Sequence, residues 1–162
     1  MGFLSRLFGF ATKEEAGGAK LNDREPWVVP PNRDASVVLR ALPILFPIGY
    51  FVYFEDTTES SFAAWLKAHT LPAPLKIARG TIWPKTDYYH VPLEPSLLAE
   101  AANIVDREGI ALPSIHLCVH DGKQVLLEWY DAFCDDSICV ASLIPRDRVE
   151  AFAHALGVSL RN

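Results

Sequence analysis

Cysteine is scarce in this sequence of 162 residues, and the three that occur, Cys118, Cys134 and Cys139, include no C-x-x-C pair. An odd number without paired spacing argues against the disulfide framework of a secreted protein. The first ten residues also do not resemble a signal peptide, because Arg6 interrupts their apolar run and no small-residue cleavage site follows. We therefore expect a cytoplasmic protein.

Long hydrophobic runs are also missing. The most apolar stretch, residues 37–54, is interrupted by Arg40, Pro43, Pro47 and Gly49. A membrane-spanning helix needs about 20 consecutive apolar residues, so this stretch is too short and too broken to cross a bilayer. It predicts one or two buried strands instead.

A short amphipathic segment opens the chain. Phe3, Leu4, Leu7 and Phe8 would share one face of a short helix. Arg6 alone adds positive charge there, which is little for attachment to a membrane surface. We expect this segment to dock on a partner or on the chain's own domain, and shallow membrane insertion and a disordered end are the alternatives.

Basic residues are outnumbered, with 15 lysines and arginines against 20 aspartates and glutamates and a net charge of −5 at pH 7. This balance argues against a dedicated nucleic-acid-binding protein, which normally presents a basic face. Between positions 121 and 136, five carboxylates oppose Lys123 alone, a net charge of −4. They are Asp121, Glu128, Asp131, Asp135 and Asp136. They predict an acidic surface for a protein partner, for which a basic partner is the natural complement, and solvated loop carboxylates are the alternative.

The usual signatures of nucleotide and catalytic sites are missing as well. The sequence has no glycine-rich phosphate loop, no dinucleotide-binding fingerprint and no Ser-His-Asp order. Glu55, Asp56 and Glu59 surround an expected strand-to-helix turn, where helix capping and first-turn charge explain them. We therefore expect no cofactor and favour a protein without catalysis.

Apolar residues make up half of the chain and aromatic residues 11%, which suffices for one hydrophobic core. Breakers occur at short intervals in residues 1–34, which we expect to form a flexible N-terminal tail with the short amphipathic start. Residues 35–162 are expected to form a single α+β domain.

The order of the expected elements predicts the fold class. Helices are expected after a Thr58 cap, from Pro95 to a left-handed Gly109, and after an Asp147 cap. Strands are expected at 37–39, 48–54, 75–83, 88–91, 114–120, 123–134 and 139–143, the 48–54 strand being central and the next two lying near a sheet edge. We predict an α+β fold: a mainly antiparallel sheet of about five to six strands with about three helices packed on it, and a C-terminal β-meander followed by a helix.

His116, Cys118 and His120 would share one face of the expected 114–120 strand. A two-residue Asp121-Gly122 turn would pair His120 with Lys123 and leave this face the less buried one. Imidazole and thiolate are zinc ligands, but His116 and His120 would lie about 13 Å apart, so other ligands would be needed. The alternatives are a thiol nucleophile at Cys118 and a structural strand face.

Tyr88, Tyr89 and His90 form an aromatic cluster with Trp83 near a proline-bounded edge. Such clusters serve as binding hot spots, although core packing is the commoner role. Together with the acidic surface they favour a small protein-binding module, such as an inhibitor, an immunity-type protein or an adaptor. The alternative is a metal- or thiol-dependent enzyme that uses His116, Cys118 and His120.

Overall fold

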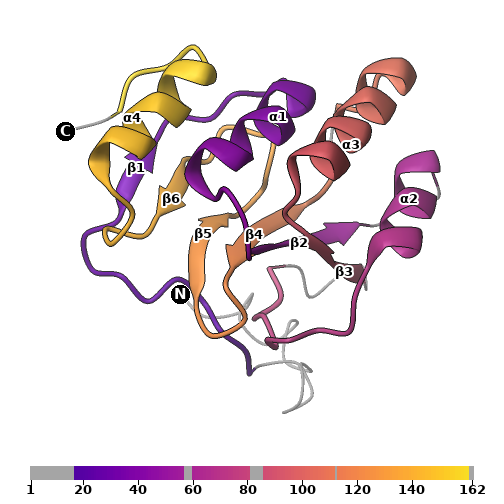
Figure 1. Cartoon of the computed structure of the whole chain (residues 1–162), viewed down its shortest axis with the longest axis horizontal. Coiled ribbons are helices and arrows are strands. Elements are labelled where there is room, and N and C mark those ends of the chain that lie inside the picture. The colour runs from indigo at the N-terminus through magenta and orange to yellow at the C-terminus, as the bar shows by residue number, and fades with distance from the viewer. Residues whose placement is uncertain (1–16, 57–59, 81–85, 112, 161–162) are drawn as a thin grey trace, which may run out of the picture.

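The chain forms one antiparallel sheet of six strands and four helices in the part that the computed structural model describes, residues 17–56, 60–80, 86–111 and 113–160 (Figure 1). The strands, in the spatial order β1-β6-β5-β4-β2-β3, are β1 (Trp27–Val29), β2 (Phe51–Asp56), β3 (Asp87–Pro92), β4 (His116–His120), β5 (Val125–Trp129) and β6 (Ile138–Val140). The helices are α1 (Ala35–Leu45), α2 (Ser61–His69), α3 (Pro95–Glu108) and α4 (Arg146–Ala155). The predicted α+β fold with a mainly antiparallel sheet is confirmed.

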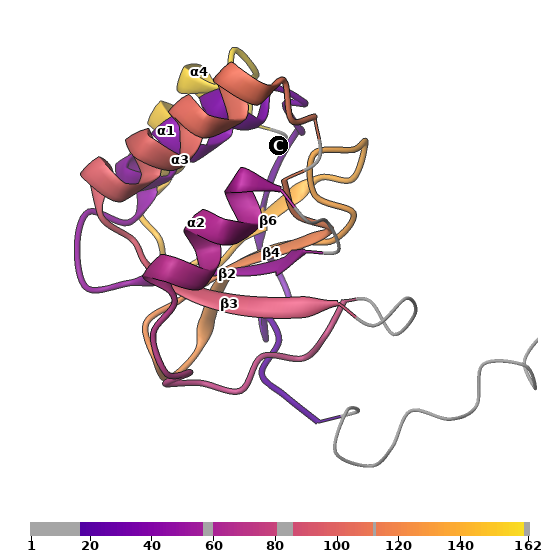
Figure 2. The same ribbon diagram turned by 90° about the vertical axis from the view of Figure 1, so that its right-hand side faces the viewer.

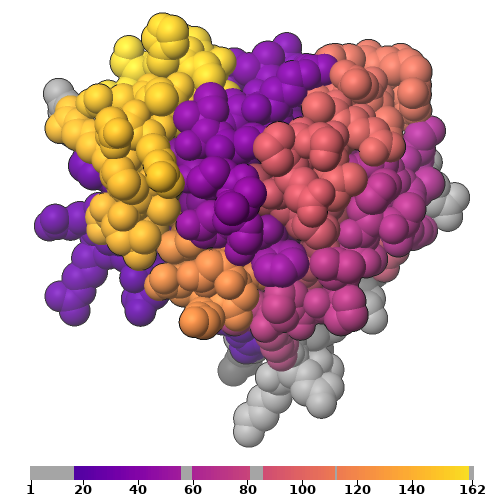
Figure 3. Space-filling view, viewed as in Figure 1, coloured from indigo at the N-terminus to yellow at the C-terminus, as the bar shows by residue number. Residues whose placement is uncertain are grey.

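The two faces of the sheet have different neighbours. The four helices lie on one face, and coil segments cross the other (Figure 2). Helices α4, α1 and α3 lie side by side in Figure 3. The main apolar core lies between them and the sheet, where it includes Val52, Phe54, Leu117 and Val119. The side chains that alternate with these residues point to the face without helices.

Helix α1 replaces the strand that we expected at 37–39, and that expectation was wrong. The Asp34 side chain caps the helix by accepting hydrogen bonds from the backbone N–H groups of Ser36 and Val37. Buried positions then recur with helical spacing, at Val38, Leu39, Leu42 and Leu45 among others. Packing of this face against the core overrides the strand preference of the adjacent valines.

The expectation of a flexible tail at residues 1–34 was wrong for its C-terminal part. Trp27–Val29 forms β1 at one edge of the sheet, where it pairs with β6. Further upstream, Ala19 makes an isolated parallel bridge to Ile77, and this bridge is all that the described residues show of the strand expected at 75–83. The amphipathic segment at Phe3–Phe8 lies outside the described residues.

The ends of the helices follow the sequence signals in part. Helix α3 begins at Pro95 and ends at Gly109 with a φ of 63°, both as expected. Ser60 caps α2, and Thr58 lies outside the described residues. The cap expected at Asp147 was wrong, because Pro145 is the N-cap residue of α4 and Asp147 lies in the first turn.

The β4–β5 hairpin has a wider turn than expected. Asp121 Oδ1 accepts hydrogen bonds from the backbone N–H groups of Lys123 and Gln124, at 2.8 and 2.9 Å, so the turn spans four residues. His120 therefore faces Val125, and a bulge between Val119 and His120 shifts the register beyond it. The expected pairing of His120 with Lys123 was wrong.

Burial of Val29 provides a test of the role of β1. Val29 is fully buried and pairs with Ile138, whereas its neighbour Val28 is half-buried. Val29→Ala should lower the free energy of unfolding by about 1 to 3 kcal/mol, because it removes two methyl groups from a packed site. Urea denaturation would measure the loss, and Val28→Ala is the matched control with a loss below about 1 kcal/mol. Equal, small losses for both variants would contradict the placement of β1 in the core.

Candidate functional site

Titratable and aromatic side chains from β2, β3, β4, β5 and the residue after β5 gather on the sheet face opposite the helices. Their rings and polar atoms contact one another across the strands. We call this set the polar face, and it comprises Tyr53, Glu55, His90, His116, Cys118, His120, Glu128 and Tyr130.

Two coil segments, residues 18–21 and 75–80, cover the polar face, and we call them the strap. Ile77 from the strap packs against Tyr53 and Cys118 in a small apolar cluster. The approach is close, because an added Cβ atom at Gly18 would clash with Ala78 and one at Gly80 would clash with the His116 ring. Glycine is therefore required at position 18, where the two segments of the strap meet, and at position 80, where the strap touches the sheet.

Glu55 lies at the centre of the contact between strap and sheet, and it is fully buried. Its Oε1 accepts hydrogen bonds from the Tyr53 hydroxyl and the Gly80 N–H, both at 2.8 Å, and its Oε2 accepts one from the Thr86 hydroxyl at 3.4 Å. His116 Nδ1 lies 3.6 Å from Oε1. Burial alone would raise the pKa of Glu55, but its contacts with His116, Gly80 and Tyr53 hold the pKa below its usual value. Glu55 is therefore a buried carboxylate in its charged form.

His116, Cys118 and Glu128 form a cluster beside Glu55. The Cys118 Sγ atom lies 3.1 Å from His116 Nε2, and Glu128 Oε1 lies 3.8 Å from the same nitrogen. One ligand atom from each of the three residues lies within 4.8 Å of the others. Burial, followed by the charges of Glu128 and Glu55, raises the pKa of the Cys118 thiol well above its usual value. These three side chains could hold a metal ion.

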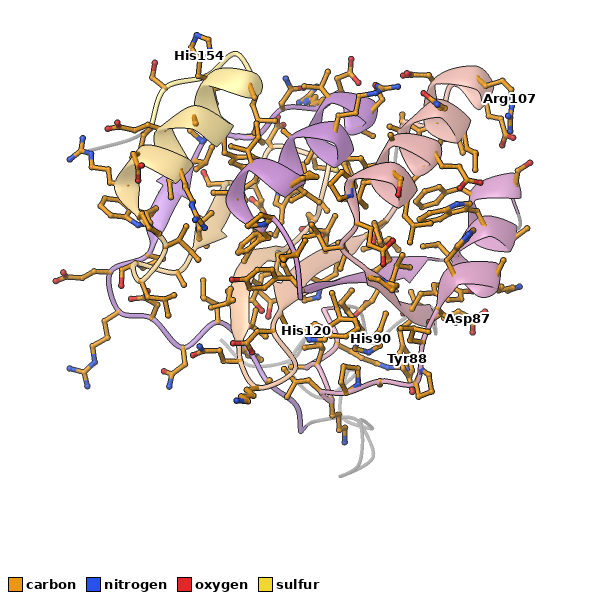
Figure 4. All side chains as sticks on the ribbon, viewed as in Figure 1. Asp87, Tyr88, His90, Arg107, His120 and His154 are labelled. Atoms are coloured by element: carbon orange, nitrogen blue, oxygen red, sulfur yellow. The ribbon has the colours of Figure 1, made fainter. Side chains whose placement is uncertain are left out.

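His90 and His120 form a second contact on the polar face. His90 Nδ1 lies 2.9 Å from His120 Nε2, and His120 Nδ1 accepts a hydrogen bond from the Gly122 N–H at 3.2 Å. With Nδ1 as an acceptor, neutral His120 donates from Nε2 to His90. The pKa of each imidazole is lowered to about 4, mainly by burial, and at His90 the charge of His120 contributes to the same shift. Figure 4 shows the two rings close together.

The structure changes the predicted His-x-Cys-x-His set. His116 and Cys118 are brought together, whereas His120 is directed to His90. The expectation of a less buried strand face was wrong, because the exposed fractions of His116, Cys118 and His120 are 1%, 0% and 0%. The strap covers this face, and the shifted hairpin register puts Glu128 opposite Cys118.

The five acidic residues singled out in the sequence occupy three places. Asp131, Asp135 and Asp136 are exposed on the turn between β5 and β6. Asp121 caps the turn at the other end of β5, and Glu128 belongs to the polar face. The exposed side chain of Asp135 pairs with Arg33.

The β5–β6 turn has a defined conformation. The indole N–H of Trp129 donates a hydrogen bond to the Asp136 carbonyl at 2.7 Å, and the Trp129 and Phe133 rings pack at 4.7 Å between centroids. Asp131 and Phe133 have φ values of 42° and 66°, which non-glycine residues adopt only when the surrounding structure requires it. The acidic side chains of this turn are therefore displayed on a packed scaffold.

A groove of about 400 Å³ connects the turn to the polar face. It lies between the N-terminal segment and strands β5 and β6, and its walls combine carboxylates with apolar side chains. The lining residues are Leu21, Asp23, Pro26, Glu128, Tyr130, Asp136, Ser137 and Cys139. We call it the acidic groove. Asp23 is fixed there by hydrogen bonds from the backbone N–H groups of Ser142 and Glu25, which hold its pKa below the usual value.

The predicted aromatic cluster is divided by the sheet. Tyr88 is 49% exposed and lies under the Arg79 guanidinium at 4.8 Å, whereas Tyr89 is 6% exposed and belongs to the apolar core. Neighbouring residues of a strand point to opposite faces, so Tyr88 and Tyr89 cannot form one surface. Trp83 lies outside the described residues.

Sequence reasoning missed the functional context of Glu55 and Glu128. Glu55 was interpreted as a residue of the turn before α2, and Glu128 as a surface acid. A glutamate at the end of the apolar 48–54 stretch was the available signal for Glu55. The position of Glu128 had no such signal, since it depends on the register of β5.

Comparisons with protein-family models, curated proteins and solved structures found no match to this chain. Within the described residues, none of the helices has the length and apolar character needed to cross a bilayer. Function is therefore inferred from the geometry of the polar face, the acidic groove and the β5–β6 turn.

The buried histidines predict that stability falls in acid. A pKa of about 4 in the folded protein, against about 6.5 when unfolded, means that the folded state binds fewer protons between these values. Stability is full above about pH 6.5 and should fall by the order of 2 kcal/mol for the pair as the pH approaches 4, with solvent screening included. Chemical denaturation at several pH values would measure it.

His120→Gln should roughly halve this slope, because one of the two shifted groups is removed. His154→Gln is the control, since His154 is exposed on α4 away from the pair (Figure 4). Glu55, with its pKa below its usual value, contributes only at lower pH. A slope between pH 6.5 and 4.5 that His120→Gln leaves unchanged would contradict the assignment.

Proposed function

We propose that this protein is a non-catalytic protein-binding module, such as an inhibitor, an immunity-type protein or an adaptor, that receives a basic segment of a partner protein. The observation that carries the proposal is the acidic groove, where Asp23, Glu128 and Asp136 line one cavity next to the exposed acids of the β5–β6 turn. Three free cysteines fit a reducing compartment, and we propose the cytoplasm.

The lining of the acidic groove matches the chemistry of lysine and arginine. Leu21, Pro26 and Tyr130 offer apolar contact to the aliphatic stem of a basic side chain, while Asp23 and Asp136 attract its charged end. The backbone hydrogen bonds at Asp23 and the Trp129–Asp136 hydrogen bond hold these parts in place before binding. Such preorganisation reduces the entropy lost when a partner binds.

The alternative of a thiol-dependent enzyme has less support. Cys118 is fully buried under the strap, and the pKa of its thiol is raised rather than lowered. A nucleophilic cysteine needs an accessible thiolate at neutral pH. The buried thiol therefore argues against thiol catalysis and favours binding at the acidic groove.

Reversing the charge of the turn should weaken the binding of basic partners. The double variant Asp135→Lys, Asp136→Lys should lose at least about tenfold in affinity for a partner captured from the host, because like charges repel at the contact. The matched control is Asp87→Lys, Glu100→Lys, which makes the same change of net charge at exposed positions on β3 and α3. Biosensor affinities at low and high salt would measure both variants.

A defined lysine-rich peptide provides a second probe. Its addition to ¹⁵N-labelled protein should shift the backbone amide signals of residues 136 and 137 and those near Asp23, with weaker effects at high salt. Equal losses of affinity for the two double variants, or an affinity that does not change with salt concentration, would overturn the electrostatic basis of the proposal.

A further inference from the structure

We propose that His116 Nε2, Cys118 Sγ and Glu128 Oε1 form a binding site for a zinc ion on the polar face. This site goes beyond the proposed binding of a protein partner and does not depend on it. The three ligands lie on two adjacent strands: His116 and Cys118 on β4, and Glu128 opposite Cys118 on β5.

The spacing of the three atoms suits a tetrahedral ion. Zinc bonds of about 2.3 Å to sulfur and about 2.0 to 2.1 Å to nitrogen or oxygen place neighbouring ligand atoms roughly 3.3 to 3.6 Å apart. The observed separations are 3.1 Å from Cys118 Sγ to His116 Nε2 and 3.8 Å from that nitrogen to Glu128 Oε1. Cys118 Sγ and Glu128 Oε1 lie within 4.8 Å of each other, so displacements of about an ångström or less would bring all three atoms to one ion.

Glu55 orients His116 for this role. Its charged carboxylate lies 3.6 Å from His116 Nδ1, which favours a proton on Nδ1 and leaves the Nε2 lone pair directed at Cys118 and Glu128. Carboxylate–histidine–zinc arrangements of this kind are typical of protein metal sites. The Tyr130 ring, stacked on the imidazole at 4.3 Å between centroids, holds the ring plane.

Glu128 Oε1 is a second, independent indication of a ligand. It is buried, has no hydrogen-bond partner, and lies within the cluster. Buried carboxylate oxygens are normally satisfied, so one without a donor indicates a missing positive or hydrogen-bonding group. A zinc ion would supply that group.

The chemistry of the three side chains selects the ion. A thiolate and an imidazole favour zinc over magnesium or calcium, which prefer oxygen ligands. Zinc binding would replace the proton on Cys118 Sγ, and this proton would pass to the solvent. Glu128 also lines the acidic groove, which offers a path for a cation and space for a water molecule as fourth ligand.

Cobalt and zinc titrations of the full chain would test the site. We expect one equivalent of Co²⁺ to give the d–d absorption of a tetrahedral ion together with a thiolate-to-cobalt charge-transfer band, and Zn²⁺ to displace it. Zn²⁺ should raise the thermal unfolding temperature and release protons on binding.

Two ligand variants and one control distinguish a site from general affinity. Cys118→Ser should abolish the charge-transfer band and weaken Zn²⁺ binding by about 100-fold or more, and the nearly isosteric Glu128→Gln by about tenfold or more. Cys134→Ser should change neither, since Cys134 is exposed on the β5–β6 turn and lies outside the cluster. Circular dichroism would establish that each variant is folded.

Two results would overturn the proposal. One is wild-type protein that binds no stoichiometric Zn²⁺ or Co²⁺ at pH 7.5. The other is folded Glu128→Gln and Cys118→Ser protein that binds the metal as tightly as the wild type. Loss of metal binding without loss of partner binding would leave the protein-binding proposal intact, so the two proposals can fail separately.

Discussion

The buried carboxylate of Glu55 constrains much of the structure on the helix-free side of the sheet. An ionised carboxylate loses several kcal/mol of hydration when it is buried, so it needs donors from every direction. Those donors are Tyr53 on its own strand, Gly80 in the strap and Thr86 next to β3. Because segments far apart in the sequence must meet at one side chain, this face forms only when the strap is in place. The same carboxylate lies against Nδ1 of His116 and so affects how that ring presents its other nitrogen.

The two faces of the sheet differ in composition and in role because of this constraint. The helix face is apolar and accounts for most of the core, with α1 and α3 packed over the central strands. The polar face contributes fewer apolar contacts and contains groups that are costly to bury, such as His90, His120 and Cys118. Buried titratable groups with strongly shifted pKa values occur more often at functional sites than in structural cores. The polar face is therefore interpreted as a functional site.

The fold could be predicted from sequence where local signals and burial agree. Helix α3 has an apolar stripe, a proline at its start and a glycine at its end, and the structure shows all three. The segment of α1 misled the prediction because its valines favour strands, while the decisive features, the Asp34 cap and the helical spacing of buried residues, became apparent only with the core.

The candidate site was harder to predict because it depends on register. The side chain of Asp121 widens the hairpin turn, and a bulge follows at His120, so Glu128 rather than Val125 faces Cys118. A shift by an odd number of residues exchanges the two faces of a strand, which moved Glu128 and Tyr130 onto the polar face. The strap was equally hard to predict from the sequence, since it pairs Ala19 with Ile77, two residues that are far apart along the chain. The sequence between positions 121 and 136 has an acidic excess, but the structure distributes its carboxylates over the turns at the two ends of β5 and the polar face.

The most direct test of this account is the anomalous difference density of a crystal of the full chain grown with zinc. The account predicts one strong peak bonded to His116 Nε2, Cys118 Sγ and Glu128 Oε1, with Glu55 against His116 Nδ1. Density that shows these three side chains without a peak between them, while zinc binds elsewhere or not at all, would contradict it.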